Sequence, residues 1–199
     1  TIMLVSKFDH CLNDILFRVR NKSLNLRIKA VVSNHKIAED IANFSNIPFH
    51  YLPIEKSNKL DQEKKLKEII NDNDVELIVL ARYMQVLSEE LTNEYSGKII
   101  NIHHSFLPSF KGARPYHQAF DRGVKVIGAT AHYVTKDLDE GPIIEQDTQE
   151  VNHEMMPSDL VLMGRDIEAR VLYRAIKAHS ERRVFLNDNR TIVFRGQRI

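Results

Sequence analysis

The first half of the chain alternates short apolar runs with longer amphipathic segments. The apolar runs predict five strands, at residues 2–5, 28–32, 49–52, 75–81 and 98–103. The run at residues 75–81 is apolar nearly throughout, which is typical of a strand that is covered on both faces.

The segments between these runs predict helices. One apolar face recurs at i, i+3, i+4 and i+7, at Leu12, Ile15, Leu16 and Val19. The next helix turns its apolar residues inward at Ile37, Ala38, Ile41 and Ala42. Residues 60–74 predict a charged helix, and a short helix is expected from Ser88.

The second half has longer extended runs, at residues 125–134 and 141–151, which predict antiparallel strands. A long helix follows, with Ser158 as its N-cap, and runs to about His179. Residues 183–194 predict a terminal hairpin. Strands that alternate with helices indicate βαβ units. We therefore predict one α/β domain over residues 1–199: an open, doubly wound, mostly parallel sheet with antiparallel C-terminal strands.

Composition excludes several classes of function. The chain is 43% hydrophobic with a net charge of +1, so neither nucleic acid nor a membrane is expected as a partner. No apolar run reaches the roughly 20 residues that span a bilayer, and the start "TIMLVS" lacks the features of a signal peptide. The single cysteine, Cys11, excludes an intramolecular disulfide and fits a reducing compartment, so we expect a cytoplasmic protein.

Glycine placement excludes a phosphate-binding loop in the first half. The first glycine is Gly97, whereas Walker and Rossmann motifs need glycine directly after an early strand. Nucleotide-dependent chemistry is therefore not expected.

The strand at residues 98–103 ends in polar side chains. Asn101 and His103 are two residues apart and share one face, while Ile102 and His104 are expected on the other. At the carboxyl end of a parallel strand, that face opens into the crevice where doubly wound sheets bind ligands. A histidine that merely caps the sheet edge is an equally good interpretation of this pattern alone.

A second polar group lies in the loop between the two later strands. It holds Asp137, Asp139 and Glu140, just before Gly141 and Pro142. Taken alone, acidic residues before Gly-Pro are ordinary turn chemistry.

Together with Asn101 and His103, the loop becomes a candidate part of an active site. An amide, an imidazole and a carboxylate are the minimum set for acyl hydrolysis or transfer without a covalent intermediate. Acid–base catalysis contributes about 10²–10⁴-fold to such reactions.

Other candidates for chemistry have weaker patterns. The histidines raise the possibility of a metal site, but no HExxH or Cys/His ligand spacing is present. Cys11 stands beside His10 at a predicted helix start, although its apolar neighbours favour a structural thiol. Ser105 has no GxSxG context that would make it a nucleophile. No role follows from the sequence for His132.

These motifs resemble those of the superfamily of hydrolases and transferases that use formyltetrahydrofolate. In that group an Asn-x-His strand end precedes a Ser-x-Leu-Pro run and, later, Leu-Asp-x-Gly-Pro. Here Asn101 and His103 precede "SFLP" from Ser105, and "LDEGP" begins at Leu138. The likeness covers essentially the whole chain and implies a formyltransferase-like fold.

Within the superfamily, "HHSFLPSFKGARPYHQAF" and "GATAHYVTKDLDEGPIIEQD" most resemble the deformylases. The resemblance implies a hydrolase that converts 10-formyltetrahydrofolate to tetrahydrofolate and formate, which supplies purine synthesis and balances one-carbon folate pools. It implies Asp139, His103 and Asn101 as catalytic residues, with no metal and no cofactor.

The resemblance also implies a pterin pocket around the segment "LARYMQVL" and the acidic loop. The expected substrate-binding residues are Leu80, Met84, Gln85, Val86, Leu87, Thr135, Asp137 and Leu138. A strand-to-helix turn that packs its own side chains would look the same in sequence.

Phosphoribosylglycinamide formyltransferase is the alternative within the superfamily. That enzyme carries a Gly-Ser-Asn type phosphate loop after its first strand, where this chain has "SKFDH". Phe8 and Asp9 would oppose a phosphate ester there, so water is the expected acceptor.

The resemblance has implications for assembly. The deformylases normally carry a small regulatory ACT-type domain before the catalytic one, so we expect this chain to be the catalytic portion of a longer protein. A homo-oligomer is expected, with a small folate as its ligand. Three rival functions are a formyltransferase with another acceptor, a folate-binding sensor without catalysis, and a metal-dependent amidase.

Overall fold

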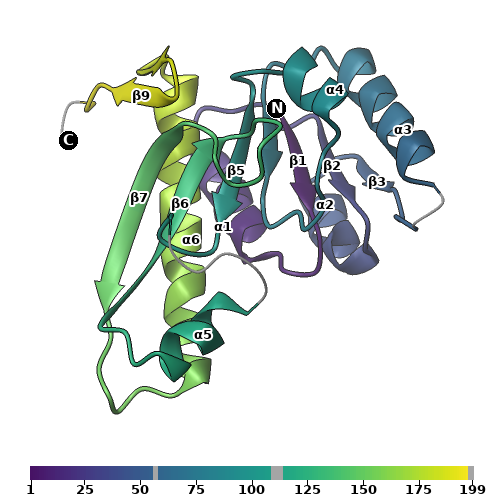
Figure 1. Cartoon of the computed structure of the whole chain (residues 1–199). Coiled ribbons are helices and arrows are strands. Elements are labelled where there is room, and N and C mark those ends of the chain that lie inside the picture. The colour runs from purple at the N-terminus through teal and green to yellow at the C-terminus, as the bar shows by residue number, and fades with distance from the viewer. Residues whose placement is uncertain (56–57, 109–113, 197–199) are drawn as a thin grey trace.

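A computed structural model of the chain describes residues 1–55, 58–108 and 114–196. Within these residues a seven-stranded sheet forms the centre of the fold, in the order β3-β2-β1-β4-β5-β6-β7 (Figure 1). Its strands are β1 (Ile2–Val5), β2 (Ala30–Ser33), β3 (Phe49–Tyr51), β4 (Ile78–Leu80), β5 (Ile99–His103), β6 (Val126–Tyr133) and β7 (Ile143–Glu150).

The strands β1 to β5 pair in parallel, whereas β6 is antiparallel to both of its neighbours. A separate hairpin follows, made of β8 (Val184–Asn187) and β9 (Arg190–Val193). The prediction of an open, doubly wound, mostly parallel α/β sheet with antiparallel C-terminal strands is confirmed.

Helices cover both faces of the sheet. They are α1 (His10–Arg20), the 3₁₀ helix η1 (Lys36–Ala38), α2 (Glu39–Phe44), α3 (Lys59–Asp72), α4 (Glu89–Glu94), α5 (Pro115–Asp121) and α6 (Pro157–Ser180). On β1, Met3 and Val5 pack in one core with residues of α1 and α6, whereas Ile2 and Leu4 pack in another with residues of α3 and α4. Successive side chains of β1 point to opposite faces of the sheet and pack in two different cores. This explains why β1 is apolar at every position.

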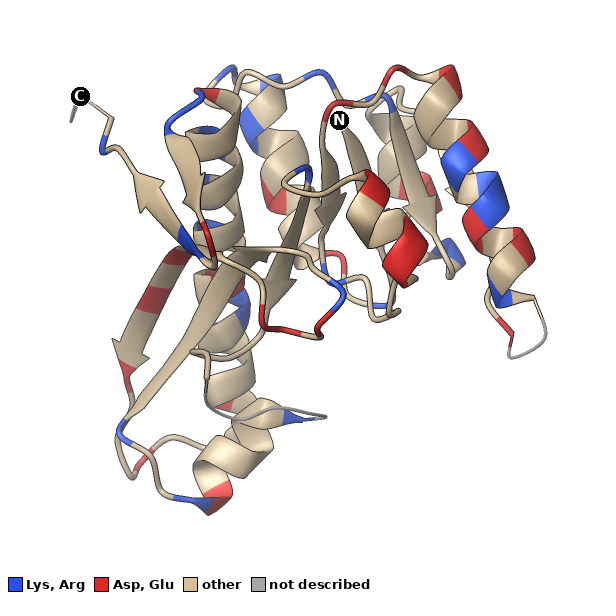
Figure 2. Cartoon of the chain, turned by 45° about the horizontal axis from the view of Figure 1, so that its top comes forward, with Lys and Arg blue, Asp and Glu red and all other residues tan. Residues whose placement is uncertain are grey.

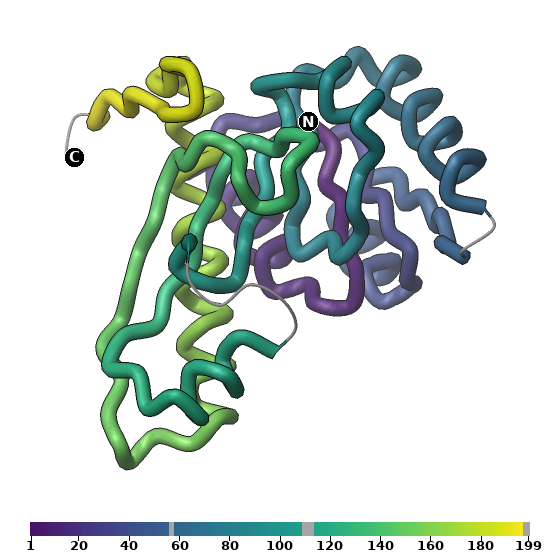
Figure 3. The backbone as a smooth tube through the Cα atoms, in the orientation of Figure 1, coloured from purple at the N-terminus to yellow at the C-terminus, as the bar shows by residue number. Residues whose placement is uncertain are grey.

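The outer surface and the overall shape follow from this arrangement. Figure 2 shows acidic and basic residues interleaved along α3, the pattern of a solvated helix face. The pair β6 and β7, together with α6, extends past the parallel strands and carries α5 near its far end (Figure 3).

The order of strands fixes where a ligand can bind. β2 and β3 lie on one side of β1, whereas β4 and β5 lie on the other, so the order in which strands are added to the sheet reverses between β1 and β4. Doubly wound sheets bind ligands outside the carboxyl ends of the strands at such a point. β5 pairs in parallel with β4, and its polar end at Asn101 and His103 therefore lies along the same edge.

Some predicted details of the elements were wrong. The strand expected at residues 28–32 is β2, two residues further along, and the strand expected at 75–81 shortens to β4. Ile37, expected to point inward, is 56% exposed because it lies in a 3₁₀ helix, whose period of three residues differs from that of an α-helix. The helix α5 has no counterpart among the predicted elements.

The long helix α6 begins one residue before its predicted N-cap. Met156 rather than Ser158 is the N-cap, and the Asp159 carboxylate accepts a hydrogen bond of 2.8 Å from the Met156 backbone N–H. Pro157 occupies the first helical position, where its missing N–H costs nothing and its fixed φ suits the helix.

Glycine has a packing role in α6. A Cβ atom built on Gly164 would overlap the Tyr116 ring of α5. The Tyr116 hydroxyl donates a 2.6 Å hydrogen bond to Glu168, one turn further along α6, so this ring is not free to retreat. The close approach of α5 to α6 therefore depends on the absence of a side chain at residue 164.

Gly164→Ala is expected to lower the free energy of unfolding by about 1–3 kcal/mol through overpacking. In a helix without this contact, the same change would raise stability by about 1 kcal/mol. Urea unfolding followed by circular dichroism measures the difference.

Leu162→Ala is the matched control, because Leu162 is on the same helix but 60% exposed. It should change the unfolding free energy by less than about 0.5 kcal/mol. A Gly164→Ala variant that is as stable as the wild type would contradict the packing described for α5.

Candidate active site

A cavity of about 290 Å³ lies at the carboxyl ends of β4 and β5. The segment after β4 forms one wall, and the loop between β6 and β7 forms another. All of the predicted site residues line it, namely Asn101, His103, Asp139, Leu80, Met84, Gln85, Val86, Leu87, Thr135, Asp137 and Leu138. Sequence positions that lie up to 59 residues apart, from Leu80 to Asp139, therefore meet around one space.

The central contact of this cavity joins β5 to the β6–β7 loop. Asp139 Oδ1 lies 3.2 Å from His103 Nδ1, and the two side chains are only 15% and 5% exposed. Burial alone would raise the pKa of Asp139, but the hydrogen bonds and charges of the adjacent His103 and His132 rings outweigh it and hold that pKa well below its usual range. The carboxylate is therefore ionised and fixed beside the imidazole at neutral pH.

The backbone of the loop is shaped to present this carboxylate. Asp139 has a left-handed φ of 57°, a conformation that aspartate tolerates better than most residues. Two residues later, a Cβ on Gly141 would overlap the Tyr133 carbonyl oxygen, and the Tyr133 N–H donates a 2.9 Å hydrogen bond to Pro142. Glycine at residue 141 thus allows the loop to fold closely over β6.

His132 orients the Asn101 amide, a role that the sequence did not reveal. The sheet register places His132 opposite Asn101. His132 Nδ1 lies 2.8 Å from the Tyr133 carbonyl oxygen, which can only accept, so this nitrogen carries a proton. His132 Nε2 lies 3.7 Å from Asp139 Oδ1 and 3.2 Å from Asn101 Nδ2: the protonated ring pairs with the carboxylate, and the neutral ring accepts a hydrogen bond from the amide. This contact leaves the second amide hydrogen of Asn101 available for a ligand oxygen.

The other nitrogen of His103 has no partner. Its Nε2 is buried and makes no hydrogen bond within the part of the chain that the structure describes. Leaving a buried hydrogen-bonding atom unpaired costs about 1–3 kcal/mol, so a ligand that pairs with His103 Nε2 removes this cost.

The expectation that His104 points to the opposite face was wrong. It follows the last residue of β5, where strand alternation no longer holds, and its ring stacks on that of His103 with centroids 5.0 Å apart. His104 therefore lines the same cavity as His103.

This arrangement can act on a carbonyl group. The Asn101 amide donates hydrogen bonds, the His103 Nε2 atom donates one when the imidazole is protonated, and the ionised Asp139 carboxylate accepts them. Donors of this kind stabilise the oxyanion of a tetrahedral intermediate when they are held in place before the reaction.

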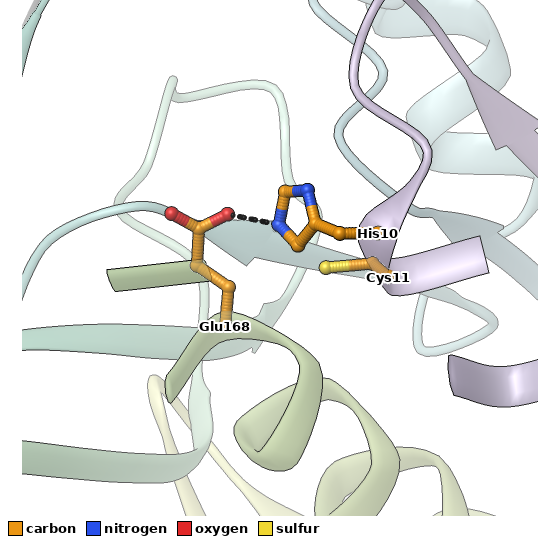
Figure 4. Close-up of side chains that lie close together, drawn as sticks. All are labelled: His10, Cys11 and Glu168. Atoms are coloured by element: carbon orange, nitrogen blue, oxygen red, sulfur yellow. Dashed lines mark hydrogen bonds and ion pairs between the residues drawn. The ribbon is translucent and has the colours of Figure 1, made fainter. Parts of the chain in front are cut away.

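A second cluster of titratable side chains lies next to this cavity. His10 and Cys11 of α1 face Glu168 of α6 (Figure 4). Glu168 is 1% exposed and is held by His10 Nε2 at 2.8 Å, the Tyr116 hydroxyl at 2.6 Å and Arg82 Nε at 3.2 Å. Burial would raise the pKa of Glu168, but these partners outweigh it and lower that pKa.

The geometry of this cluster is compatible with a metal ion, but its charges and bonds are not. Both Glu168 oxygens already have partners, and the Arg82 guanidinium supplies the positive charge that a metal would bring. Burial, with a smaller contribution from the charge of Glu168, raises the pKa of Cys11, so its sulfur stays protonated and is a poor ligand. This cluster therefore does not fit a metal centre.

Sequence reasoning missed part of the cavity wall. The further lining residues are Arg82, Tyr83, Thr92, Ile102, His104, His132, Val134 and Lys136. Arg82 lies inside the segment "LARYMQVL", where a charged residue directly after a buried strand was the available signal. Residues 109–113 of the quoted motif lie outside the described residues. A second cavity, of about 560 Å³, lies beside α5 and shares His104.

Comparison with known proteins gives consistent matches. The formyl transferase family model matches residues 1–176. A formyltetrahydrofolate deformylase from Corynebacterium sp. (strain P-1) is 54% identical over 98% of this chain and 68% of its own length. The crystal structure of a Burkholderia mallei formyltetrahydrofolate deformylase superposes with a TM-score of 0.94 at 52% identity, covering 98% of this chain and 69% of that one.

The alternative enzyme class also matches, at lower identity. The crystal structure of glycinamide ribonucleotide transformylase 1 from Symbiobacterium toebii has a TM-score of 0.90 at 28% identity, covering 98% of this chain and 93% of that one. The chain spans about two thirds of the length of the deformylases described above. Within the described residues, none of the helices combines the length and the apolar character that crossing a bilayer requires.

The lowered pKa of Asp139 predicts a pH-dependent contribution to stability. Its folded pKa lies below the unfolded value of about 3.9. The ionised carboxylate therefore stabilises the fold above that pH, and this stabilisation is lost as the pH falls through the folded pKa. Asp139→Asn should unfold at a lower temperature than the wild type at pH 7, with the difference shrinking below about pH 4 in thermal unfolding scans.

Asp74→Asn is the control, because Asp74 is exposed and has a similar left-handed φ of 49°. It should follow the wild type at every pH. A gap between Asp139→Asn and the wild type that stays constant from pH 7 to pH 3 would contradict the assigned ion pair.

Proposed function

Since the chain belongs to the formyl transferase family, we propose that it hydrolyses the formamide of 10-formyltetrahydrofolate to tetrahydrofolate and formate. As such it is a hydrolase of a linear amide C–N bond, like the deformylases to which it is similar. The observation that carries the proposal is the meeting of Asn101, His103 and Asp139 at one cavity.

Each of these three side chains has a distinct role in the proposed reaction. Asp139 accepts a proton from the attacking water and keeps His103 in place. As water adds to the formyl carbon, the carbonyl oxygen becomes an oxyanion that Asn101 and the protonated His103 stabilise. His103 then gives its proton to N10 of the folate as the C–N bond breaks.

The folate ring is proposed to lie between the two walls of the cavity. Leu80 and Leu87 are buried apolar residues on one wall, whereas Thr135 and Asp137 belong to the other. A flat ring with polar edges fits a site in which apolar side chains cover its faces and backbone groups read its edges. Met84 and Val86 are 53% and 54% exposed and would be covered by the bound ring.

One structural feature favours water over an amine as the acceptor. The segment after β1 carries Phe8, whose ring centroid lies 5.5 Å from the guanidinium carbons of both Arg82 and Arg165. Phe8, 42% exposed, thus stands in the turn between β1 and α1, where a phosphate ester would need a glycine-rich backbone. The higher identity to deformylases than to the glycinamide ribonucleotide enzyme agrees with this assignment.

The cellular setting follows from the reaction. The formate would supply purine synthesis, and the reaction would balance one-carbon folate pools in the cytoplasm. Self-association stays a prediction, which sedimentation analysis at several protein concentrations tests. The regulatory domain expected ahead of residue 1 also stays a prediction.

Asp139→Asn should lower the rate of formate release by at least about 10²-fold, because the base is lost while the shape of the side chain is kept. The affinity for tetrahydrofolate should change little. Formate is measured with a coupled dehydrogenase assay, and folate binding by fluorescence titration. Asp74→Asn is the control and should keep full activity, since Asp74 is exposed and does not line the cavity.

Full formate release by Asp139→Asn would refute the catalytic assignment. The same assay without any amine separates hydrolysis from transfer, because a transferase would release almost no formate under that condition. Tight folate binding with an unchanged formyl donor would indicate a sensor. Loss of turnover on exhaustive chelation would indicate a metal-dependent amidase.

A further inference from the structure

Arg82 has buried hydrogen-bond donors that no atom of residues 1–55, 58–108 or 114–196 satisfies. Its Nε and Nη1 atoms are buried without a hydrogen-bond partner, and His103 Nε2 is the remaining side-chain atom of this kind within the described residues. Both residues line the active-site cavity. Native proteins pair nearly all buried polar groups, so unpaired donors on two residues of one cavity wall point to a missing acceptor.

The position of Arg82 in the fold fits a ligand-binding residue. Arg82 lies two residues after β4, next to β1, where the strand order of the sheet reverses. Its carbonyl oxygen accepts a 3.2 Å hydrogen bond from the N–H of Ser6, which follows β1. Leu80 of β4 is paired with Asn101 of β5, and Arg82 and His103 each lie two residues further along their own chain segments. The guanidinium thus comes from the same sheet edge as the catalytic imidazole.

Holding Arg82 there has an energetic cost. Its φ of 64° lies in the left-handed region, which costs about 1 kcal/mol or more for a residue with a side chain. Its side chain is 9% exposed, so the guanidinium has also lost most of its hydration. Strain and desolvation at one cavity-lining residue are typical of a functional site.

The neighbouring carboxylate does not use the donors of Arg82. Glu168 Oε2 lies 3.2 Å from Arg82 Nε, which balances the charge, but the angle does not make a hydrogen bond. That oxygen already pairs with His10 Nε2, and the other oxygen of Glu168 pairs with Tyr116. Glu168 therefore holds the guanidinium as a counter-ion and leaves its N–H groups for another acceptor.

We propose that Arg82, together with His103, forms the subsite that binds the carboxylate of the released formate. The inference rests on the proposed hydrolysis and adds a binding site for its small product. A guanidinium with unpaired N–H groups donates charge-assisted hydrogen bonds to carboxylate oxygens. Arg82 lines the same cavity in which the formyl group would be hydrolysed.

The chemistry of the step supplies this ligand. Water forms a new C–O bond to the formyl carbon, the C–N10 bond breaks, and N10 takes a proton to become the secondary amine of tetrahydrofolate. The one-carbon fragment leaves as formic acid, which loses a proton to give formate at neutral pH. Arg82 and His103 then bind this anion in the cavity that both residues line.

Formate inhibition of the wild type and of Arg82 variants tests this subsite. A ligand of three non-hydrogen atoms binds at about millimolar concentration at best, so formate is titrated against sodium chloride of equal ionic strength. Arg82→Gln should raise the inhibition constant of formate at least tenfold, and Arg82→Lys should fall between the two. Line broadening of ¹³C-formate in the resting protein measures the same binding without turnover.

Arg165→Gln is the matched control, since Arg165 lies equally close to the Phe8 ring but does not line the cavity. It should keep the formate inhibition of the wild type. Tetrahydrofolate affinity should also stay within about twofold in Arg82→Gln, which separates a lost subsite from a damaged cavity. If Arg82→Gln does not fold, Arg82→Gln combined with Glu168→Gln removes both charges and replaces it.

The outcomes separate this proposal from the proposed function. Equal formate inhibition in the wild type and in the Arg82 variants, with normal turnover, would overturn the subsite and leave hydrolysis intact. A wild type that releases no formate would overturn hydrolysis instead. Line broadening that is the same with and without Arg82 would likewise reject the subsite.

Discussion

The ion pair between Asp139 and His103 is the contact on which the rest of the site depends. His103 comes from the end of the last parallel strand, whereas Asp139 comes from the loop between the two antiparallel strands. The pair therefore ties the two halves of the sheet together at the point where chemistry is proposed. Its burial strengthens the attraction and keeps the imidazole aimed at the cavity. Gly141 is needed because only a residue without a side chain lets the loop approach β6 closely enough.

The topology of the sheet explains why one cavity can serve two fragments of a substrate. The reversal of the strand order between β1 and β4 opens a crevice at their carboxyl ends. The segment after β4 and the loop after β6 offer apolar walls suited to a flat ring. Arg82, in the same segment after β4, and its counter-ion Glu168 provide a buried charged group suited to a small anion.

The fold and the main site residues could be predicted because they follow from local pattern. Strand and helix periods gave the α/β class, and the motifs around Asn101 and Asp139 marked the residues that line the cavity. Contacts that depend on register or side-chain packing could not be predicted. His132 meets Asn101 only because β5 and β6 pair in one particular register. Likewise, Arg82 reaches Glu168 through the packing of α6, which no short-range pattern encodes.

The central claim is that the formyl carbonyl lies between the amide of Asn101 and the free nitrogen of His103, with Asp139 behind the imidazole. A crystal structure with a 10-formyl folate analogue that resists hydrolysis tests this most directly. The account predicts that the formyl oxygen lies within hydrogen-bond distance of Asn101 Nδ2 and His103 Nε2, while Asp139 stays in contact with His103 Nδ1. A formyl group directed to solvent, or an imidazole turned away from Asp139, would contradict it.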